Sequence, residues 1–313
     1  MTRHQQWTAA HIPDQTDRVF VVTGATSGLG LATARAVASR GGHVILAVRD
    51  EEKGRRTVAE LAAAQPGASL EVRRLDLADL SSVRAFADGL RADRTHVDVL
   101  VNNAGVMAPP RTLSAQGHEL QFAANHLGHF ALTGLLLDLL AAGRDPRVVT
   151  VSSLKHRQGR LDFDDLSGER RAYHPMGFYS HSKLANAVFG HELHRRLSEA
   201  GSPVRSLLAH PGYAATALAA GSVGLVKAMF GRLLVPLAQS PDQGALPQLY
   251  AATAPEARGG EFYGPSGPGE LRGAPSRVRP AARATDAATG RRLWEVSERL
   301  TDVRFALPGP ARR

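Results

Sequence analysis

A short apolar strand, a glycine-rich turn and a helix follow one another near the start of the chain, and this order limits the fold more than any other stretch. Residues 17–23 have the β-branched pattern of a buried strand, glycines stand at positions 24, 28 and 30, and apolar residues then recur at helical spacing to Ala38. Glycines let the backbone approach a phosphate group, and the N–H groups at a helix start attract its charge. A plain turn is the alternative, but the context favours a phosphate-binding loop.

The same alternation of strand and helix continues along the chain. Further strands are predicted at 43–48, 70–75, 97–101, 147–151 and 204–209, with helices at 51–64, 79–94, 117–142 and from Tyr179 onward. Such alternation predicts one doubly wound α/β domain of the Rossmann type, with a parallel sheet and helices on both faces. We assign residues 1–313 to this single domain and residues 17–263 to its core. Ligands of such sheets bind beyond the carboxyl ends of the strands.

The residues that end the second strand indicate which dinucleotide is preferred. Arg49 follows the strand directly, where enzymes that prefer NAD usually carry an acidic residue for the ribose 2′-hydroxyl. An arginine would attract a 2′-phosphate through charge-assisted hydrogen bonds, so NADP(H) is preferred and NAD(H) is the alternative. The neighbouring Asp50 would weaken this argument, but we interpret it as the cap of the helix that follows. Asp76 and Leu77, after the third strand, are predicted to contact the adenine, with a turn or cap role as the alternative for Asp76.

A tyrosine and a lysine four residues apart suggest proton transfer. On a helix, positions i and i+4 share a face, so Tyr179 and Lys183 would project side by side. A cation beside a phenol lowers its pKa towards values useful for acid–base chemistry. Taken alone, the pair is more often a solvated surface pair than a catalytic one. Its position after a phosphate-binding loop favours the catalytic interpretation.

Composition excludes several other functions. The 313 residues include 43% hydrophobic residues, enough for a large core, and no cysteine, which excludes disulfides, thiolate catalysis and cysteine-based metal sites. The net charge is +9, but the arginines are scattered and no aromatic residues interleave with the C-terminal ones, so no nucleic-acid partner is predicted. Asp162, Asp164 and Asp165 lack calcium-loop spacing, and no metal site is predicted. We expect no membrane span and a cytoplasmic location, because residues 1–17 have no apolar signal core.

Two later segments have less specific patterns. Residues 218–237 are apolar but broken by glycines, a proline and charges, and we interpret about 216–240 as an amphipathic lid over an apolar substrate. A plain core helix and peripheral membrane contact are the alternatives. Residues 264–283 are rich in Gly, Pro and Arg and predict a surface loop. A last amphipathic helix, with Leu293 and Trp294, would pack as core or as an oligomer contact.

These motifs together resemble the short-chain dehydrogenase/reductase family. The chain has Thr23-Gly24-x3-Gly28-x-Gly30, the run NNAG at 102–105, Asn125, Ser153 and Tyr179-x3-Lys183 in the family's order. The likeness covers about residues 17–263. The runs VSSLKH at 151–156 and YSHSKLAN at 179–186, with the long interval between them, look most like the retinol dehydrogenase branch.

This resemblance implies a set of roles. Tyr179 would be the acid–base residue, Lys183 would bind the nicotinamide ribose and lower the tyrosine pKa, Ser153 would position the substrate oxygen, and Asn125 would hold a relay water. Ser152 fits the family pattern less well. The residues predicted to contact the cofactor are Gly24, Thr26, Ser27, Gly28, Leu29, Gly30, Arg49, Asp76, Leu77, Asn103, Ala104, Gly105, Tyr179, Lys183, Pro211, Gly212 and Thr216.

The function that follows is an NADP(H)-dependent oxidoreductase that interconverts an apolar alcohol and its ketone or aldehyde. A homo-oligomer, joined through the helices that carry Asn125 and Tyr179, is expected from the family. The alternative from another class is a non-catalytic NADP(H)-sensing regulatory protein on the same fold, which the Tyr179–Lys183 pair disfavours.

Overall fold

The computed structural model describes residues 6–214 and 238–307, and its centre is one mostly parallel sheet. Within this part of the chain the sheet has eight strands in the order β3-β2-β1-β4-β5-β6-β7-β8. Neighbours are parallel except for β7 and β8, which are antiparallel. The strands are β1 (Val19–Thr23), β2 (His43–Val48), β3 (Leu70–Arg74), β4 (Val99–Asn102), β5 (Arg147–Val151), β6 (Arg205–Ala209), β7 (Phe262–Pro265) and β8 (Pro275–Arg277).

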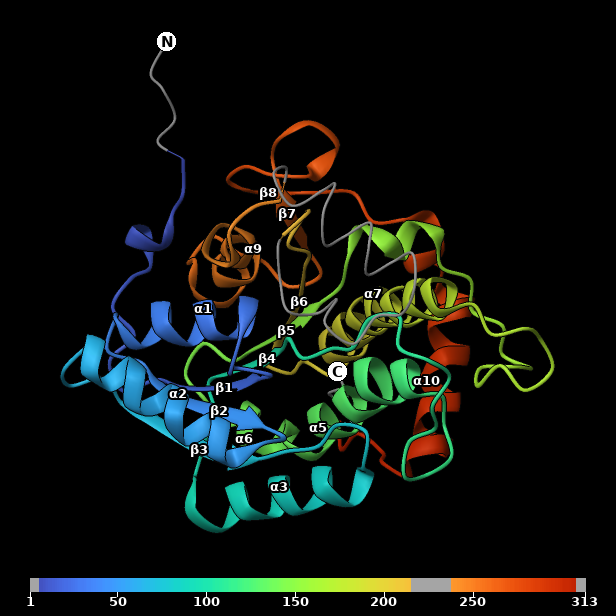
Figure 1. Ribbon diagram of the computed structural model, residues 1–313, viewed down its shortest axis with the longest axis horizontal. Coiled ribbons are helices and arrows are strands. Elements are labelled where there is room, and N and C mark those ends of the chain that lie inside the picture. Colours follow the sequence, from blue (N-terminus) through green and yellow to red (C-terminus); the bar gives the residue numbers. More distant parts are fainter. Residues whose placement is uncertain (1–5, 215–237, 308–313) are drawn as a thin grey trace.

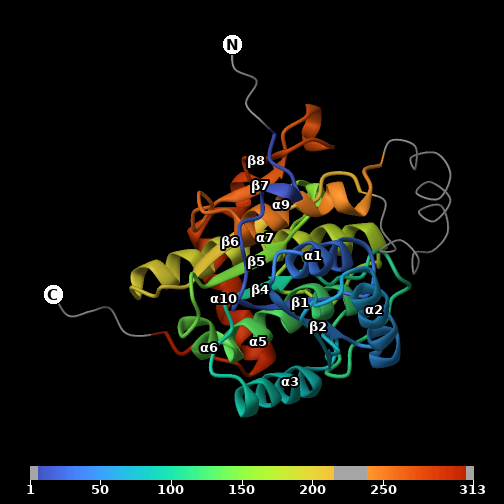
Figure 2. The ribbon, with the colours of Figure 1, turned by 90° about the vertical axis from the view of Figure 1, so that its left-hand side faces the viewer.

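Helices cover both faces of this sheet (Figure 1). One buried cluster joins the sheet to α1 and α9, and a second joins it to α3, α5 and α7. Figure 2 shows α1 and α3 on opposite sides of the sheet. The helices are α1 (Gly28–Ala38), α2 (Glu51–Ala64), α3 (Leu80–Asp93), α4 (Leu120–Phe122), α5 (Gly128–Leu135), α6 (Leu137–Ala141), α7 (Pro175–Glu199), α9 (Pro241–Thr253) and α10 (Ala287–Thr301). The predicted doubly wound α/β fold is confirmed.

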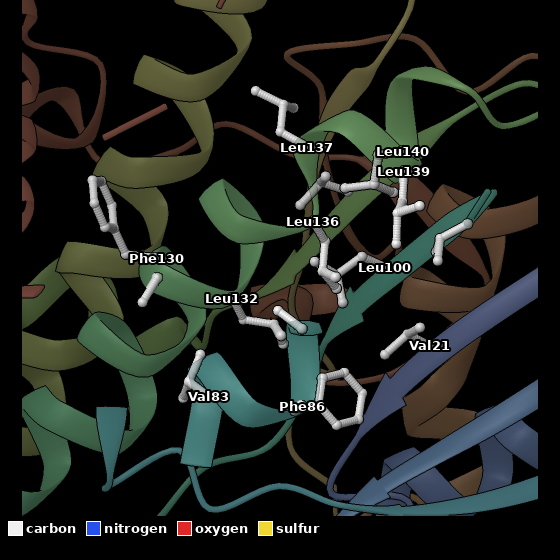
Figure 3. Packing of buried hydrophobic residues seen from close by; sticks show 14 of the residues in the cluster. Val21, Val83, Phe86, Leu100, Phe130, Leu132, Leu136, Leu137, Leu139 and Leu140 are labelled. Atoms are coloured by element: carbon white, nitrogen blue, oxygen red, sulfur yellow. The ribbon is translucent and has the colours of Figure 1, made fainter. Parts of the chain in front are cut away.

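The second cluster shows why the central strands are apolar along their whole length. Val21 of β1 and Leu100 of β4 contribute to the same buried cluster as Phe86 of α3 and Leu132 of α5 (Figure 3). Phe20 and Val22 point to the other face and join the first cluster. A strand with helices on both sides buries odd and even positions alike, so its sequence does not alternate.

The predicted helix at 117–142 is broken into pieces. The chain is α-helical at α4, π-helical over Ala123–Leu127, and α-helical again in α5 and α6. A π-helical turn inserts one extra residue into a helix and is frequent at functional sites. Here it contains Asn125, one of the predicted site residues.

The C-terminal part also differs from its prediction. Residues 264–283 are not only a loop, because they include the end of β7 and all of β8. The last helix, α10, packs as core, with Leu293 and Trp294 almost fully buried against α7 and α5. It therefore covers faces of the two helices through which an oligomer was expected. The predicted lid lies almost entirely outside the described residues.

Candidate functional site

A cavity of about 1090 Å³ runs along the carboxyl edge of the sheet. Strands β2, β1, β4, β5 and β6 lie side by side in this order, and the segment that follows each strand contributes residues to the lining of the cavity. Parallel strands place their carboxyl ends at one edge, which explains why motifs far apart in sequence meet here. The predicted residues that line the cavity are Gly24, Thr26, Ser27, Gly28, Leu29, Arg49, Asn103, Ala104, Gly105, Ser153, Tyr179, Lys183, Pro211 and Gly212.

The glycine-rich turn needs its glycines for two different reasons. Gly24 has a φ of +67°, which disfavours side chains, and a Cβ there would lie 3.0 Å from Ala104. A Cβ on Gly30 would lie 2.5 Å from the Gly24 carbonyl oxygen, so this glycine allows α1 to pack against the turn and does not line the cavity. Asn103 holds the turn from the neighbouring strand, because its Nδ2 donates to the Thr23 carbonyl at 2.8 Å.

The start of α1 presents backbone donors to the cavity. Ser27 is the N-cap residue, and its side chain makes no capping hydrogen bond. The first N–H groups of an α-helix have no partner within the helix, and the helix dipole adds partial positive charge. Together with the glycine turn, this arrangement fits a pyrophosphate group.

Positive charge gathers where β2 ends. Arg49 and Lys53 both line the cavity, and none of the ion pairs recorded within residues 6–214 and 238–307 includes either of them. The Asp50 carboxylate accepts a hydrogen bond from the Lys53 backbone N–H at 3.0 Å, so Asp50 caps α2, as the sequence predicted. Sequence reasoning missed Lys53, although its position in the first turn of α2 brings it back beside Arg49.

Tyr179, Ser153 and Lys183 come together at the floor of the cavity. Tyr179 and Lys183 stand one turn apart on α7, which begins four residues before Tyr179, and are 4% and 3% exposed. Ser153 lies close enough to Tyr179 for its hydroxyl to influence the tyrosine pKa. The Lys183 Nζ atom lies 5.8 Å from the centre of the Tyr179 ring and donates to the Val151 carbonyl at 3.2 Å.

The expected effect of Lys183 on the tyrosine is not found in this structure. Burial raises the pKa of Tyr179 to about 12, and the Ser153 hydroxyl is the opposing influence. Burial also lowers the pKa of Lys183 to about 8, because the ammonium loses its hydration. The prediction of a lowered tyrosine pKa is therefore wrong, because burial favours the neutral phenol and outweighs the influence of Ser153.

The two adjacent serines have separate roles. The Ser152 hydroxyl is buried and donates to the Lys183 carbonyl at 2.8 Å, which ties β5 to α7. The Ser153 side chain is only partly buried and lines the cavity together with Tyr179. The geometry supports Ser153 over Ser152 as the residue that can meet a substrate oxygen.

Asn125 lies behind the cavity lining. Its Oδ1 accepts from the Val106 N–H at 2.8 Å, and its Nδ2 donates to the Val106 carbonyl at 3.0 Å and to the Ser182 hydroxyl at 2.9 Å. A Cβ on Gly105 would lie 3.2 Å from Asn125 Oδ1 and 3.5 Å from Lys183 Nζ, so both groups border the same small space. Asn125 thus holds the segment after β4 next to α7.

Besides Gly30, two predicted cofactor contacts in the described part of the chain are not brought to the cavity. Asp76 Oδ1 accepts from the Ala78 N–H at 3.0 Å, which is a turn role, and Leu77 is buried in the core below Gly128. Neither residue lines the cavity, and their contact with adenine stays a prediction. Thr216 lies outside the described residues.

Other residues line the cavity although no sequence pattern predicted them as site residues. Besides Lys53, they include Met107, Ser152, Leu154, Lys155, Gln158, Met176, Tyr213, Ala238 and Leu271. Leu154, Lys155 and Gln158 directly follow Ser153 in a 3-10 turn (Leu154–Gln158), so their nearness to a predicted residue was the available signal. Leu271 had no such signal, since it comes from the segment interpreted as a surface loop.

The described residues contain neither a metal cluster nor a membrane-spanning helix. Over residues 6–214 and 238–307, no group of three or more His, Asp or Glu side chains is placed to hold a metal ion. In the same ranges, no helix combines the length and the apolar character that crossing a bilayer requires.

Proteins with similar sequences belong to the family that the sequence motifs resemble. The sequence model of the family described as short chain dehydrogenase matches residues 18–223. Retinol dehydrogenase 13 of Homo sapiens is 40% identical over 301 residues, which cover 94% of this chain and 86% of that protein. Polyprenol dehydrogenase of Mus musculus is 42% identical over 298 residues, with 93% and 85% covered.

A solved structure adds a bound nucleotide. A short chain dehydrogenase from Escherichia coli CFT073, crystallised in complex with NADPH, superimposes with a TM-score of 0.63. The two chains are 25% identical, and the match covers 80% of this chain and 98% of that one.

Proposed function

Because this chain belongs to the short-chain dehydrogenase family and is an NAD(P)-dependent oxidoreductase acting on CH–OH groups, we propose that it uses NADP(H) to interconvert an apolar, isoprenoid-like alcohol and its carbonyl, with Tyr179 as the acid–base residue. The observation that carries the proposal is that Ser153, Tyr179 and Lys183 line one cavity, with Tyr179 and Lys183 one turn apart on α7.

The reacting groups support proton transfer to and from a substrate oxygen. With a pKa of about 12, the Tyr179 hydroxyl holds its proton at neutral pH and can donate it to a carbonyl oxygen. Ser153 can give a second hydrogen bond to the negative charge that develops on that oxygen. In the oxidation of an alcohol the same proton moves back to Tyr179.

Lys183 and Asn125 support Tyr179 from behind. The Lys183 ammonium lies on the Tyr179 side of α7 and is nearly free of water. A positive charge there stabilises the phenolate form of Tyr179 once its proton has left. The small space between Gly105, Asn125 and Lys183 is the place for a relay group that returns the proton.

The residues present fit a dinucleotide with a 2′-phosphate. The glycine-rich turn and the start of α1 suit the pyrophosphate, and Arg49 with Lys53 suits a further phosphate at the end of β2. The NADPH in the Escherichia coli structure is consistent with this preference. When bound, the nicotinamide ring supplies the hydride acceptor or donor.

The names of the relatives support an apolar alcohol. Retinol and polyprenols are both isoprenoid alcohols with a long hydrocarbon part, and the relatives named for them are 40% and 42% identical to this chain. The lining of this cavity includes apolar side chains such as Met107, Leu154, Met176 and Leu271. We propose that these side chains face the hydrocarbon part of the substrate.

The family resemblance also supports a homo-oligomer, with one change. Because α10 packs on α7 and α5, we propose that an interface between copies lies on other surfaces or on the outer side of α10. Light scattering of the purified protein measures the mass of the assembly. A monomer at micromolar concentration would contradict the oligomer.

A direct assay tests the function. The purified protein is screened with NADP⁺ and NADPH against retinol, a short polyprenol, and matched ketones and aldehydes, followed at the nicotinamide absorbance. We expect turnover of the isoprenoid alcohols or their aldehydes, faster with NADP(H) than with NAD(H). Tight binding of NADPH without turnover of any alcohol or carbonyl would contradict the proposal and favour a nucleotide-sensing role.

A further inference from the structure

The connection between β7 and β8 reaches back to the cavity. Residues 266–274, the β7–β8 arm, bring Leu271 into its lining. Leu271 is 49% exposed, and among the described residues only Leu113, at 47%, is another large apolar side chain with comparable exposure. Leu113 does not line the cavity. Of these two exposed leucines, one therefore has a place in the site and the other serves as its natural control.

The backbone at Leu271 is held firmly although the side chain is not covered. The Leu271 carbonyl accepts hydrogen bonds from the Tyr213 N–H and from Gln239 Nε2, both at 2.9 Å. A Cβ on Gly212 would lie only 2.4 Å from that carbonyl oxygen, so the arm is packed against the turn that follows β6. Gly212 has a φ of +67°, so both the space and the conformation require glycine.

The Glu270 carboxylate also fixes the position of the β7–β8 arm. Its Oε2 accepts from His210 Nε2 at 2.9 Å and its Oε1 accepts from Arg157 at 2.7 Å. The Gly212 N–H donates to His210 Nδ1, so the ring proton is on Nε2. These partners, His210 first, lower the pKa of Glu270 to about 2, so its carboxylate is charged at every working pH. Glu270 also has a φ of +57°, which a residue with a side chain adopts rarely and keeps only where its surroundings fix it.

A second link joins this region to the catalytic serine. His156 Nε2 accepts from the Ala281 N–H at 3.1 Å, so its proton is on Nδ1, which donates to the Ser153 carbonyl at 2.6 Å. His156 is fully buried. The segment after β8 and Ser153 are thus held in one network.

The order of the strands decides which ligand group Leu271 would meet. Arg49 follows β2, Ser153 follows β5, and Leu271 follows β7, so the serine stands between the basic end of the cavity and the leucine. A dinucleotide whose phosphates lie at β1 and β2 brings its reacting ring towards Ser153 and Tyr179. Leu271 then lies on the far side of the reacting carbon, where the rest of the substrate must be.

We propose that Leu271 is a specificity-determining residue that contacts the hydrocarbon part of the substrate, and that Glu270 is the positioning residue that holds it there. The inference rests on the proposed function, and it names the side chain that sets the preference for long apolar alcohols. An apolar side chain held in water by a fixed backbone gains most when a ligand covers it.

The test compares Leu271→Ala with Leu113→Ala on straight-chain allylic alcohols of increasing length. The readout is the ratio of kcat/KM for a long alcohol to kcat/KM for a short one. We expect Leu271→Ala to lower this ratio about tenfold, since a few methylene groups in an apolar pocket are worth that much. Leu113→Ala should leave the ratio unchanged, and equal ratios in both variants would overturn the proposal. Leu271→Trp should exclude branched alcohols that the wild type accepts.

Two binding measurements distinguish a failure of the proposed role of Leu271 from a failure of the proposed reaction. Calorimetric titration of the long alcohol into the NADPH-loaded protein tests the contact even where no alcohol is turned over. The wild type could bind the long alcohol about tenfold more tightly than Leu271→Ala without turning it over. This result would support the role of Leu271 and contradict the proposed reaction. Equal affinity of the two proteins for the long alcohol would overturn the proposed role of Leu271. A weaker NADPH affinity of Leu271→Ala, with an unchanged ratio of kcat/KM between long and short alcohols, would also overturn it, because Leu271 would then contact the cofactor.

A double-variant cycle tests the role of Glu270. Glu270→Gln should raise the KM for the long alcohol more than the KM for the short one, and Glu256→Gln, an exposed carboxylate away from the arm, should not. If Glu270 acts through Leu271, the variant with both Glu270→Gln and Leu271→Ala has the same ratio as Leu271→Ala alone. Additive losses would show that Glu270 has only a general structural role.

Discussion

At the β2 end of the cavity, charged side chains stand in water, whereas at the β5 end the reacting groups are almost completely buried. Arg49 and Lys53 are exposed, and they follow a single strand within a few residues of each other. Tyr179 and Lys183 are 4% and 3% exposed, and Ser153 and Asn125 reach them from other elements. The β2 end would attract a negatively charged ligand, and salt screens this attraction. The β5 end acts through the pKa values of its reacting groups, which are set by burial.

The largest expected effect is at the buried end. Tyr179→Phe removes the proton donor but keeps the ring, so we expect kcat to fall by roughly 10²–10⁴-fold while NADPH affinity changes little. Single-turnover kinetics and a fluorescence titration with NADPH measure the two quantities. Ser152→Ala is the matched change at a buried hydroxyl that does not face Tyr179. An active Tyr179→Phe variant would remove the acid–base assignment and with it the contrast between the two ends.

A pH profile sharpens the same contrast. Burial lowers the pKa of Lys183 to about 8, so its ammonium is lost as the pH rises through that value. We expect kcat/KM for carbonyl reduction to fall above this pH, because an uncharged Lys183 no longer stabilises the phenolate. Lys183→Arg keeps its charge and should lose the alkaline fall, although its overall rate is lower. The same fall in both proteins would mean that another group titrates.

A smaller effect is expected at the exposed end. Arg49→Ala should weaken NADPH binding about tenfold and NADH binding hardly at all, since one charge-assisted contact with a phosphate is lost. Arg55→Ala removes a charge from the same helix region, where Arg55 pairs with Glu51, and should not discriminate between the nucleotides. Titration of both nucleotides at two salt concentrations measures the difference. Equal losses for NADPH and NADH would mean that Arg49 does not read the 2′-phosphate.

The smallest effect concerns stability in acid. Burial lowers the pKa of His126 to about 3 and the pKa values of His129, His156, His181 and His191 to about 4. The unfolded chain binds these protons first, so stability is present above the ordinary histidine pKa and is lost as the pH falls from about 6.5 to about 4. The midpoint of thermal unfolding should fall by about 5 °C or more over this range.

Matched histidine variants test this explanation. His181→Gln should reduce the loss of stability in acid, because it removes one buried imidazole that must take up a proton. His11→Gln, at an exposed histidine, should leave it unchanged. Thermal melts followed by circular dichroism at several pH values measure both. An equal loss in all three proteins would assign the acid sensitivity to carboxylates.

Local sequence patterns predicted more of the fold than of the site's chemistry. The strands from β1 to β6 and most helices were predictable, because their apolar periodicity and turn residues are local properties. The position of Gly24, Arg49, Asn103 and Ser153 at one edge followed as well, since parallel strands end on the same side. The break at Ala123–Leu127 was not predictable, because a π-helical turn has the same apolar periodicity as the α-helix around it.

The amino-acid sequence by itself determined the family, the order of β1 to β6 and of most helices along the chain, and most of the residues that meet at the carboxyl edge. Only the tertiary structure decided that Tyr179 has a raised pKa and that Leu271 reaches the cavity from a segment without regular periodicity. The physical reason is the range of the interactions. Periodicity and turn chemistry act over a few residues, whereas desolvation and the path of an arm depend on everything that packs around them.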